Sequence, residues 1–293
     1  ELSGDHTGGA VVVTGSTSTA VTDVLYLEAS SANDDLTVTN IGAVTVKDAA
    51  AINASAISGK TMTVDGADGT SDVLTLNGTT AADTIDLSNM TVAGSTAVTF
   101  TIDAGAGGDT IDISGSTGVR ETIKVNTGDS TATIAGTGDA GTITAYDKIT
   151  GFTTGTTAAV KDVIDFQGSG AVLAGDGNSG VATIDGTNTT LTVGGDTVDA
   201  IKVAVDGEVI FLDGEQSANT EIAADAVDSA ALLAVAIQAL QGSDLGNAGA
   251  TVWMTGQIDN VNHTWVYSQT TGDAGGNFVD LVGVKLTGLS ATL

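Results

Sequence analysis

Short stretches of alternating hydrophobic and polar residues recur along the first half of the chain. Four of them resemble one another: residues 72–76 (Asp-Val-Leu-Thr-Leu), 83–88 (Asp-Thr-Ile-Asp-Leu-Ser), 109–114 (Asp-Thr-Ile-Asp-Ile-Ser) and 121–125 (Glu-Thr-Ile-Lys-Val). The central apolar residues of these and two later stretches follow one another at short and similar intervals: Leu74, Ile85, Ile111, Ile123, Ile134 and Ile143, with Ile102 dividing one longer step. This spacing predicts short strands and tight turns, two strands per repeat, in a parallel β-roll or β-helix solenoid.

Weaker copies of the pattern precede these stretches, at residues 36–38, 44–46 and 62–64. We therefore expect degenerate solenoid coils over residues 1–60 and a better-formed β-roll over 61–145. Two later strands end in aromatic residues, Phe152 and Phe166, which indicates a thicker core than a roll can hold. Residues 146–293 are accordingly predicted to form a separate β-rich C-terminal domain.

The C-terminal part contains one convincing helix, over residues 226–241. Its apolar residues have helical spacing, Asp225 or Asp228 is a candidate cap, and Gly242 is a stop signal. Strands are predicted around it at 182–184, 190–193, 200–205, 208–212, 251–254, 264–269 and 277–286, with Asp206-Gly207 as a hairpin turn. The predicted fold class is therefore all-β: a parallel solenoid and a C-terminal β-rich section carrying one helix.

The clearest chemical signal lies at residues 104–112, Ala-Gly-Ala-Gly-Gly-Asp-Thr-Ile-Asp. This segment differs at its first position from the calcium-binding nonapeptide Gly-Gly-x-Gly-x-Asp-x-(apolar)-x. Glycines at 105, 107 and 108 allow positive φ and can direct carbonyl oxygens at an ion, and Asp109 supplies a carboxylate. The segment therefore predicts a calcium site in a turn.

An ion between two consecutive turns would take ligands from both. The best-supported candidates are Asp103, Gly105, Gly107 and Asp109. An earlier site is expected to be lined by Asp65, Asp68, Asp72 and Asp83, and weaker candidates are Asp139, Asp162 and Asp176. For Asp68 and Asp72, hydrogen bonding within an ordinary Asx-turn is an equally good interpretation.

Charge and cysteine content agree with a metal-stabilised extracellular protein. The chain has 36 acidic and 8 basic residues, a net charge of −28, which disfavours nucleic acid and anionic membrane as partners and favours cations. It has no cysteine, so bound metal would replace the disulfides of a secreted protein. An acidic surface that is merely solvated is the alternative. The sequence contains no run of about 20 apolar residues, so no transmembrane helix is predicted.

The sequence contains few catalytic motifs. The two histidines, His6 and His263, are outside any His-Glu-x-x-His motif, and Gly-x-Ser-x-Gly and cysteine nucleophiles are missing. A Ser-His-Asp triad using His263 stays open, although a histidine beside Trp265 in a strand is more often structural. A carboxylate pair that cleaves glycosides also stays open, whereas a polysaccharide lyase is disfavoured because the basic residues are scattered. We expect a protein that is not an enzyme.

Several motifs together resemble the C-terminal part of hemolysin-type (RTX) proteins. They are the turn at 104–112, the phrases at 147–152 (Asp-Lys-Ile-Thr-Gly-Phe) and 162–166 (Asp-Val-Ile-Asp-Phe), and the ending at 265–268 (Trp-Val-Tyr-Ser) and 280–288 (Asp-Leu-Val-Gly-Val-Lys-Leu-Thr-Gly). The Thr- and Ala-rich S-layer proteins of Gram-negative bacteria are the most similar in composition. The resemblance covers roughly residues 60–293 and implies a Ca²⁺-loaded β-roll exported by a type I system that reads an uncleaved C-terminal signal.

Two functions follow as expectations. The first is a secreted, self-assembling S-layer or extracellular filament protein on the cell surface, with copies of itself as partners and calcium as the assembling ion. A cell-surface polysaccharide is a further candidate partner, through a part of the protein outside this chain. The second is the roll and type I secretion module of a larger adhesin or secreted enzyme whose active part precedes Glu1.

Overall fold

A computed structural model provides the structure of the chain. It describes residues 2–3, 11–15, 24–28, 31–33, 36–39, 43–46, 50–66, 72–94, 98–155, 157, 160–167, 172–173, 182–183, 191–193, 196–204, 206–213, 220–222, 227–241, 245, 249–270 and 276–286. These residues fall into two compact units, of which the first comprises Glu1–Val125 and Ile149–Asp165, and the second Asn126–Lys148 and Phe166–Leu293. The predicted boundary at residues 145–146 lies inside the segment 126–148 of the second unit.

Strands dominate the described part of both units, and the one α-helix there belongs to the second, as the all-β prediction requires. The elements of the first unit are β1 (Leu2–Ser3), β2 (Val11–Thr14), β3 (Val24–Glu28), β4 (Ser31–Asn33), β5 (Leu36–Thr39), β6 (Ala43–Val46), β7 (Ala50–Asn53), the 3-10 helix η1 (Ala54–Ala56), β8 (Thr61–Gly66), β9 (Asp72–Thr79), β10 (Thr84–Asp86), β11 (Met90–Gly94), β12 (Val98–Gly105), β13 (Thr110–Asp112) and β14 (Arg120–Val125). Strands β17 (Asp147–Thr150) and β18 (Val163–Phe166) include the points where the chain passes between the units.

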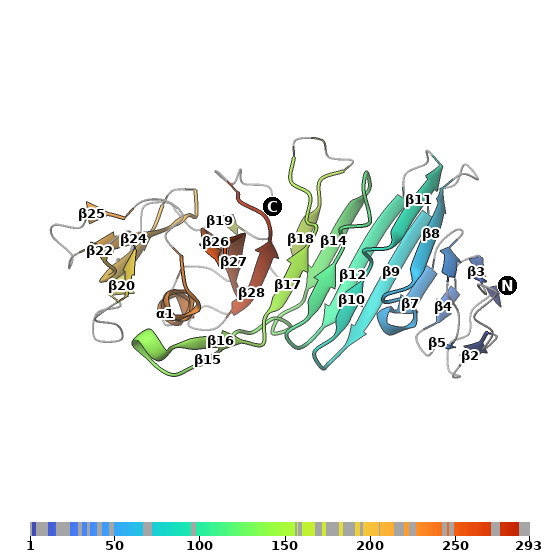
Figure 1. Ribbon diagram of the computed structural model, residues 1–293, viewed down its shortest axis with the longest axis horizontal. Coiled ribbons are helices and arrows are strands. Elements are labelled where there is room, and N and C mark those ends of the chain that lie inside the picture. Colours follow the sequence, from blue (N-terminus) through green and yellow to red (C-terminus); the bar gives the residue numbers. More distant parts are fainter. Residues whose placement is uncertain are drawn as a thin grey trace. The chain divides into compact units, whose positions relative to one another are not determined.

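The strands of the first unit pair in parallel. One sheet has the order β1-β3-β6-β8-β11, and another runs from β4 through β7, β9, β12 and β14 to β18. Leu74 faces Phe100 and Ile85 faces Ile111, so both pairs have the same offset along the chain. Figure 1 shows β7, β9, β12 and β14 lying side by side in the second of these sheets. Corresponding segments of the sequence are therefore stacked in register.

The repeat interval that begins at β9 contributes three strands rather than the predicted two, whereas the next one contributes two, β12 and β13. Strands β9, β10 and β11 pair with strands of three different rows: β9 with β12, β10 with β13, and β11 with β8. The four similar stretches accordingly divide between rows, with 72–76 and 121–125 in one and 83–88 and 109–114 in another. Sequence similarity between neighbouring stretches obscured this because all four alternate in the same way.

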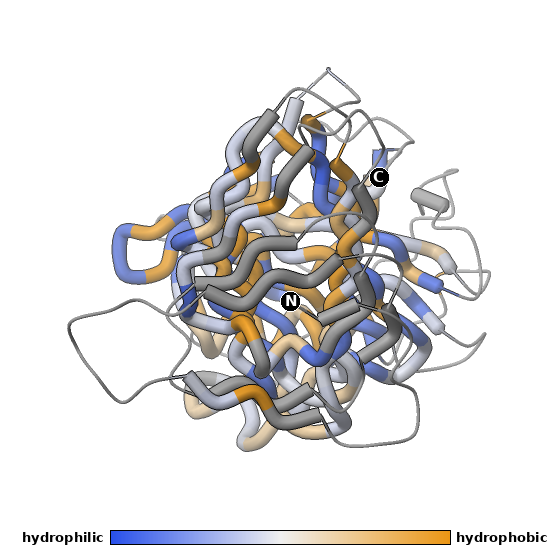
Figure 2. Tube along the Cα trace, turned by 90° about the vertical axis from the view of Figure 1, so that its right-hand side faces the viewer, coloured by the Kyte–Doolittle hydropathy of each residue, from blue (hydrophilic) through white to orange (hydrophobic). Residues whose placement is uncertain are grey.

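The core of the first unit lies along the inward-facing positions of these strands. Leu76, Ile102 and Ile123 face one another in successive strands, and each is fully buried. Along β12, buried residues alternate with exposed or half-buried ones, and the hydropathy colouring of Figure 2 follows the same alternation on the stacked strands. Burying one such side chain stabilises the fold by about 1.5–3 kcal/mol.

Residues 126–145 depart from the predicted roll. Ile134 and Ile143 pair with each other in an antiparallel hairpin, formed by β15 (Thr133–Ala135) and β16 (Thr142–Thr144). The chain reverses between them through Gly136, with φ +79°, and the 3-10 helix η2 (Gly138–Ala140). The assignment of these two isoleucines to the parallel repeat was therefore wrong.

The second unit combines antiparallel strands with the helix. Its remaining elements are β19 (Val172–Leu173), β20 (Ala182–Thr183), β21 (Thr192–Val193), β22 (Asp196–Thr197), β23 (Ala200–Val203), β24 (Val209–Asp213), β25 (Thr220–Glu221), α1 (Ala230–Gln241), β26 (Ala250–Ile258), β27 (Val261–Gln269) and β28 (Gly276–Val282). Strands β23 and β24 form the predicted antiparallel hairpin around Asp206-Gly207, and Gly207 adopts φ +84°. Strand β27 lies between β26 and β28, antiparallel to both.

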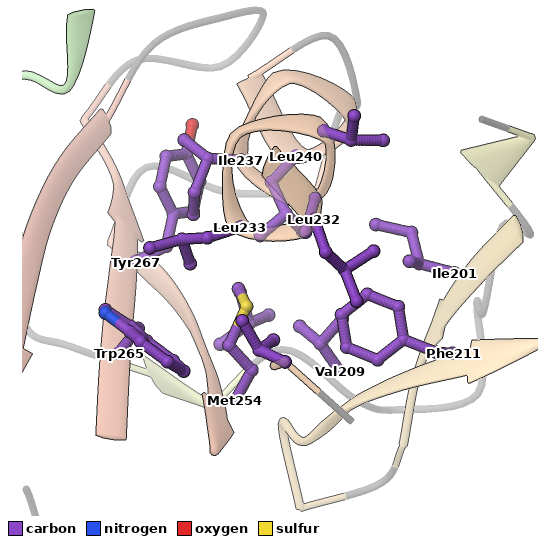
Figure 3. Packing of buried hydrophobic residues seen from close by; sticks show 14 of the residues in the cluster. Ile201, Val209, Phe211, Leu232, Leu233, Ile237, Leu240, Met254, Trp265 and Tyr267 are labelled. Carbon is purple, nitrogen blue, oxygen red and sulfur yellow. The ribbon is translucent and has the colours of Figure 1, made fainter. Parts of the chain in front are cut away.

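Helix α1 closes the core of the second unit. Figure 3 shows Leu233 and Ile237 of α1 near Tyr267 of β27, with Phe211 of β24 on another side of the same cluster. The helix begins at Ala230, later than predicted, because Val227 forms a β-bridge with Gly256. Ser229 caps the helix, since its Oγ accepts a hydrogen bond from the Leu232 N–H at 3.3 Å. Of the two predicted caps, Asp228 lies one residue before Ser229, and Asp225 lies outside the described residues. Among the described residues no helix is long and apolar enough to cross a bilayer.

Candidate metal centre

Two successive turns of the first unit lie directly over one another, at residues 77–83 and 103–109. The ladder pairs Asn77 with Asp103 and Thr79 with Gly105. At the same offset along the chain, Asp83 and Asp109 hold equivalent positions, each one residue before a Thr-Ile-Asp strand. The stacked turns therefore place the carboxylate of the nonapeptide over an acidic residue of the preceding repeat.

Glycine is required in the upper turn by close contact with the lower one. Gly105 has φ +86°, and a Cβ there would lie 1.9 Å from the Thr79 carbonyl oxygen. Gly107 has φ +136°, and its Cβ would lie 2.9 Å from the Ala82 nitrogen. Gly108 was also expected to have a positive φ, but its φ is not positive. Two of the three motif glycines thus serve the packing of turn on turn.

The carboxylates of Asp83 and Asp109 are engaged with the turns. Asp109 is fully buried, and its Oδ1 accepts a hydrogen bond from the Asp83 N–H at 2.8 Å. Oδ2 of Asp83 accepts from the N–H of Thr79 at 2.6 Å and from its hydroxyl at 2.8 Å. Asp83 therefore stabilises its own turn, and Asp109 ties its turn to the preceding one, by charge-assisted hydrogen bonds.

The donors at these turns are oxygens, the ligand type that calcium prefers. Within the described residues, no three acidic or histidine side chains are grouped so that they could hold a metal ion. An ion at this position would therefore need backbone carbonyl oxygens in addition to Asp109 and Asp83. The close stacking at Gly105 and Gly107 brings the backbone of the two turns together as this requires.

The other predicted ligands are dispersed. Asp65 is in β8. Asp72 is the first residue of β9, whereas Asp83 accepts a hydrogen bond from Thr79 at the other end of that strand. The structure therefore does not bring Asp72 and Asp83 together. Asp103, half-buried on β12, lies between Asn77 and Lys124 in the ladder. Asp139 is in η2 of the second unit. Asp68 and Asp176 lie outside the described residues.

Asp162 belongs to a buried acidic pair that the sequence reasoning missed. Its Oδ1 accepts the Glu121 N–H at 2.9 Å and its Oδ2 accepts the Thr153 N–H at 2.6 Å. The Glu121 carboxyl hydrogen-bonds with Asp162 and Ser116, and each acidic side chain is only 1% exposed. The alternation of residues 121–125 places the side chain of Glu121 on the same inward face as Ile123 and Val125, and this sequence pattern could have predicted its burial.

Burial is the main reason that the pKa of Glu121 rises to about 9. The hydrogen bond and the negative charge of Asp162 raise it further, while the Ser116 hydroxyl lowers it. A second negative charge beside Asp162 is therefore strongly disfavoured when no cation is present.

His263 also has an acidic partner. Its Nδ1 lies 2.8 Å from Oδ1 of Asp280, which is 2% exposed, and its ring stacks on Trp265 at a centroid distance of 5.0 Å. This holds two members of a Ser-His-Asp arrangement.

Comparison with known proteins returned no relatives. No family model, no curated protein and no solved structure matches the chain. The resemblance to hemolysin-type proteins is thus still a prediction from motifs.

Proposed function

We propose that the chain is a structural, self-assembling protein of a surface layer or extracellular filament, stabilised and assembled by calcium. In this proposal the first unit is a β-roll or β-helix solenoid, and the protein reaches the cell surface by type I secretion. The observation that carries it is the repeating parallel register, which stacks Asp109 over Asp83 beside a glycine turn.

Calcium has a stabilising role in this scheme. Extracellular sites bind at about 10⁻⁴–10⁻³ M, so calcium near millimolar concentration stabilises each site by on the order of 1 kcal/mol. Several coupled sites would together decide whether the first unit is rigid. We expect chelator to loosen the stacked turns before the second unit with its helix and tryptophans.

The proposed assembly depends on the net charge of the chain and on the exposed edges of its sheets. A stack of parallel strands ends in an edge whose backbone groups can pair with another chain, but copies carrying a net charge of −28 repel one another. A divalent cation shared by carboxylates of two copies converts repulsion into a directional contact. One head-to-tail contact, repeated, gives an open filament or sheet.

The test uses the full chain stripped with EDTA. It is expected to be monomeric in chelator and to form ordered sheets or fibres when calcium is added, as followed by light scattering and negative-stain microscopy. Magnesium should be much less effective because it dehydrates reluctantly. A persistent monomer at millimolar calcium would refute the proposal and favour the module of a larger adhesin or secreted enzyme.

Two variants make the test specific to the turn. Asp109→Asn removes the charge of the buried turn carboxylate and is expected to abolish calcium-driven assembly. Asp112→Asn is the matched control, because the Asp112 carboxylate serves a local turn: its Oδ1 accepts from the Ser114 N–H and hydroxyl at 2.9 and 2.6 Å. Equal assembly of the two variants would contradict the proposed site.

A further inference from the structure

Glu121 interrupts a line of inward-facing hydrophobic residues in the first unit. The ladder sets Leu74 opposite Phe100 and Phe100 opposite Glu121, so the carboxyl group occupies a position that large apolar side chains fill in the preceding strands. All three residues are at most 1% exposed. A glutamate in such a position requires compensation for its lost hydration.

Asp162 lies beside it with both carboxyl oxygens engaged: they accept backbone N–H groups, from Glu121 and Thr153. Ser116, 6% exposed, adds a hydroxyl oxygen next to Glu121. Three oxygen-bearing side chains thus converge at one buried point.

None of the described groups that act on the Glu121 carboxyl is cationic: the influences come from burial, Asp162, Ser116 and its own backbone. Glu121 Oε1 is buried and has no hydrogen-bond partner in the part of the chain that the structure describes. A shared proton would leave one net negative charge and this oxygen unsatisfied, whereas a divalent cation would neutralise two carboxylates and coordinate the oxygen.

We propose that the carboxylates of Glu121 and Asp162, with the Ser116 hydroxyl, bind one calcium ion inside the first unit. The site is distinct from the stacked turns at Asp83 and Asp109, and it rests on the proposed function only for a supply of calcium at millimolar concentration. Calcium fits better than magnesium because it accepts 6–8 oxygens in flexible geometry, with water and carbonyl oxygens completing the shell.

Isothermal titration of the chelator-stripped full chain with CaCl₂ tests this. Glu121→Gln keeps a hydrogen-bond donor toward Asp162 but removes one charge, and we expect one ion fewer per chain than in the wild type. Asp162→Asn should lose the same ion, and the double variant should also lose one, not two. Asp112→Asn is the matched control, with unchanged stoichiometry.

Far-UV circular dichroism in chelator checks that each variant is folded. Should Glu121→Gln fail to fold, Ser116→Ala carries the test, because it keeps both charges and should raise the dissociation constant of the same ion severalfold. Unchanged calcium stoichiometry in folded Glu121→Gln, or unchanged affinity in Ser116→Ala, would overturn the inference and leave a pair that shares only a proton. Loss of one ion in Glu121→Gln, combined with a wild type that never assembles, would support this site while refuting the proposed function.

Discussion

Replacing Glu121 by glutamine should change how the stability of the first unit depends on pH. In chelator the folded protein holds the Glu121 proton up to a pKa of about 9, against 4.5 for the ordinary carboxyl. Between these values the unfolded chain releases a proton that the folded chain keeps, so stability falls as pH rises. At about 1.4 kcal/mol per pH unit, raising the pH from 4.5 to 7 costs about 3 kcal/mol, and Glu121→Gln avoids this loss.

Urea unfolding in EDTA, followed by far-UV circular dichroism at pH 5 to 8, measures the effect. The stability of the wild type should fall relative to Glu121→Gln across this range. An internal control is available because both tryptophans, Trp253 and Trp265, lie in the second unit, so their fluorescence should report no difference between the two proteins. Parallel pH profiles by circular dichroism would show that Glu121 does not keep its proton and would refute the reasoning.

Three further substitutions test the packing. Gly105→Ala should destabilise the first unit by more than Gly118→Ala. Both positions have positive φ, +86° and +88°, which costs about 1–2 kcal/mol for the backbone alone, but only a Cβ at Gly105 would collide with Thr79. Equal losses of stability in urea unfolding would contradict this contact. Phe100→Ala should cost about 3–5 kcal/mol in the same assay, since Phe100 is fully buried, and a loss below about 1 kcal/mol would contradict its place in the core. Ser229→Ala should cost the second unit about 1 kcal/mol by removing the cap of α1, and tryptophan fluorescence should detect it, whereas an unchanged midpoint would argue against the cap.

The sequence predicted elements whose signals are local. The Asp206-Gly207 hairpin and the all-β class are confirmed, because turn chemistry and alternation act within a few residues. The predicted two strands per repeat fit the interval from β12 to β14 but not the one from β9 to β12, which has three, since the number depends on which strands pair across a whole interval. Ile134 and Ile143 were misplaced for the same reason: their spacing suits a parallel repeat and an antiparallel hairpin equally well.

The candidate site was predictable only in part. The motif directly indicated Gly105, Gly107 and Asp109, and the structure places them against the preceding turn. The partnership of Glu121 with Asp162 joins two segments far apart in the sequence, so no local pattern could reveal it. The calcium ligation of the turn stays a prediction.

Parallel rows that stay in register from one interval to the next also govern how such a chain can change in length. Removing or duplicating one whole interval would return every following strand to the same row and face, whereas an insertion that moved a strand by a single position would turn its buried side chains outward. Each duplicated interval would extend the stack by about 4.8 Å, the spacing of neighbouring strands. Tandem duplication could therefore lengthen the stack in steps of one strand spacing, and each added interval would bury its side chains in the existing core.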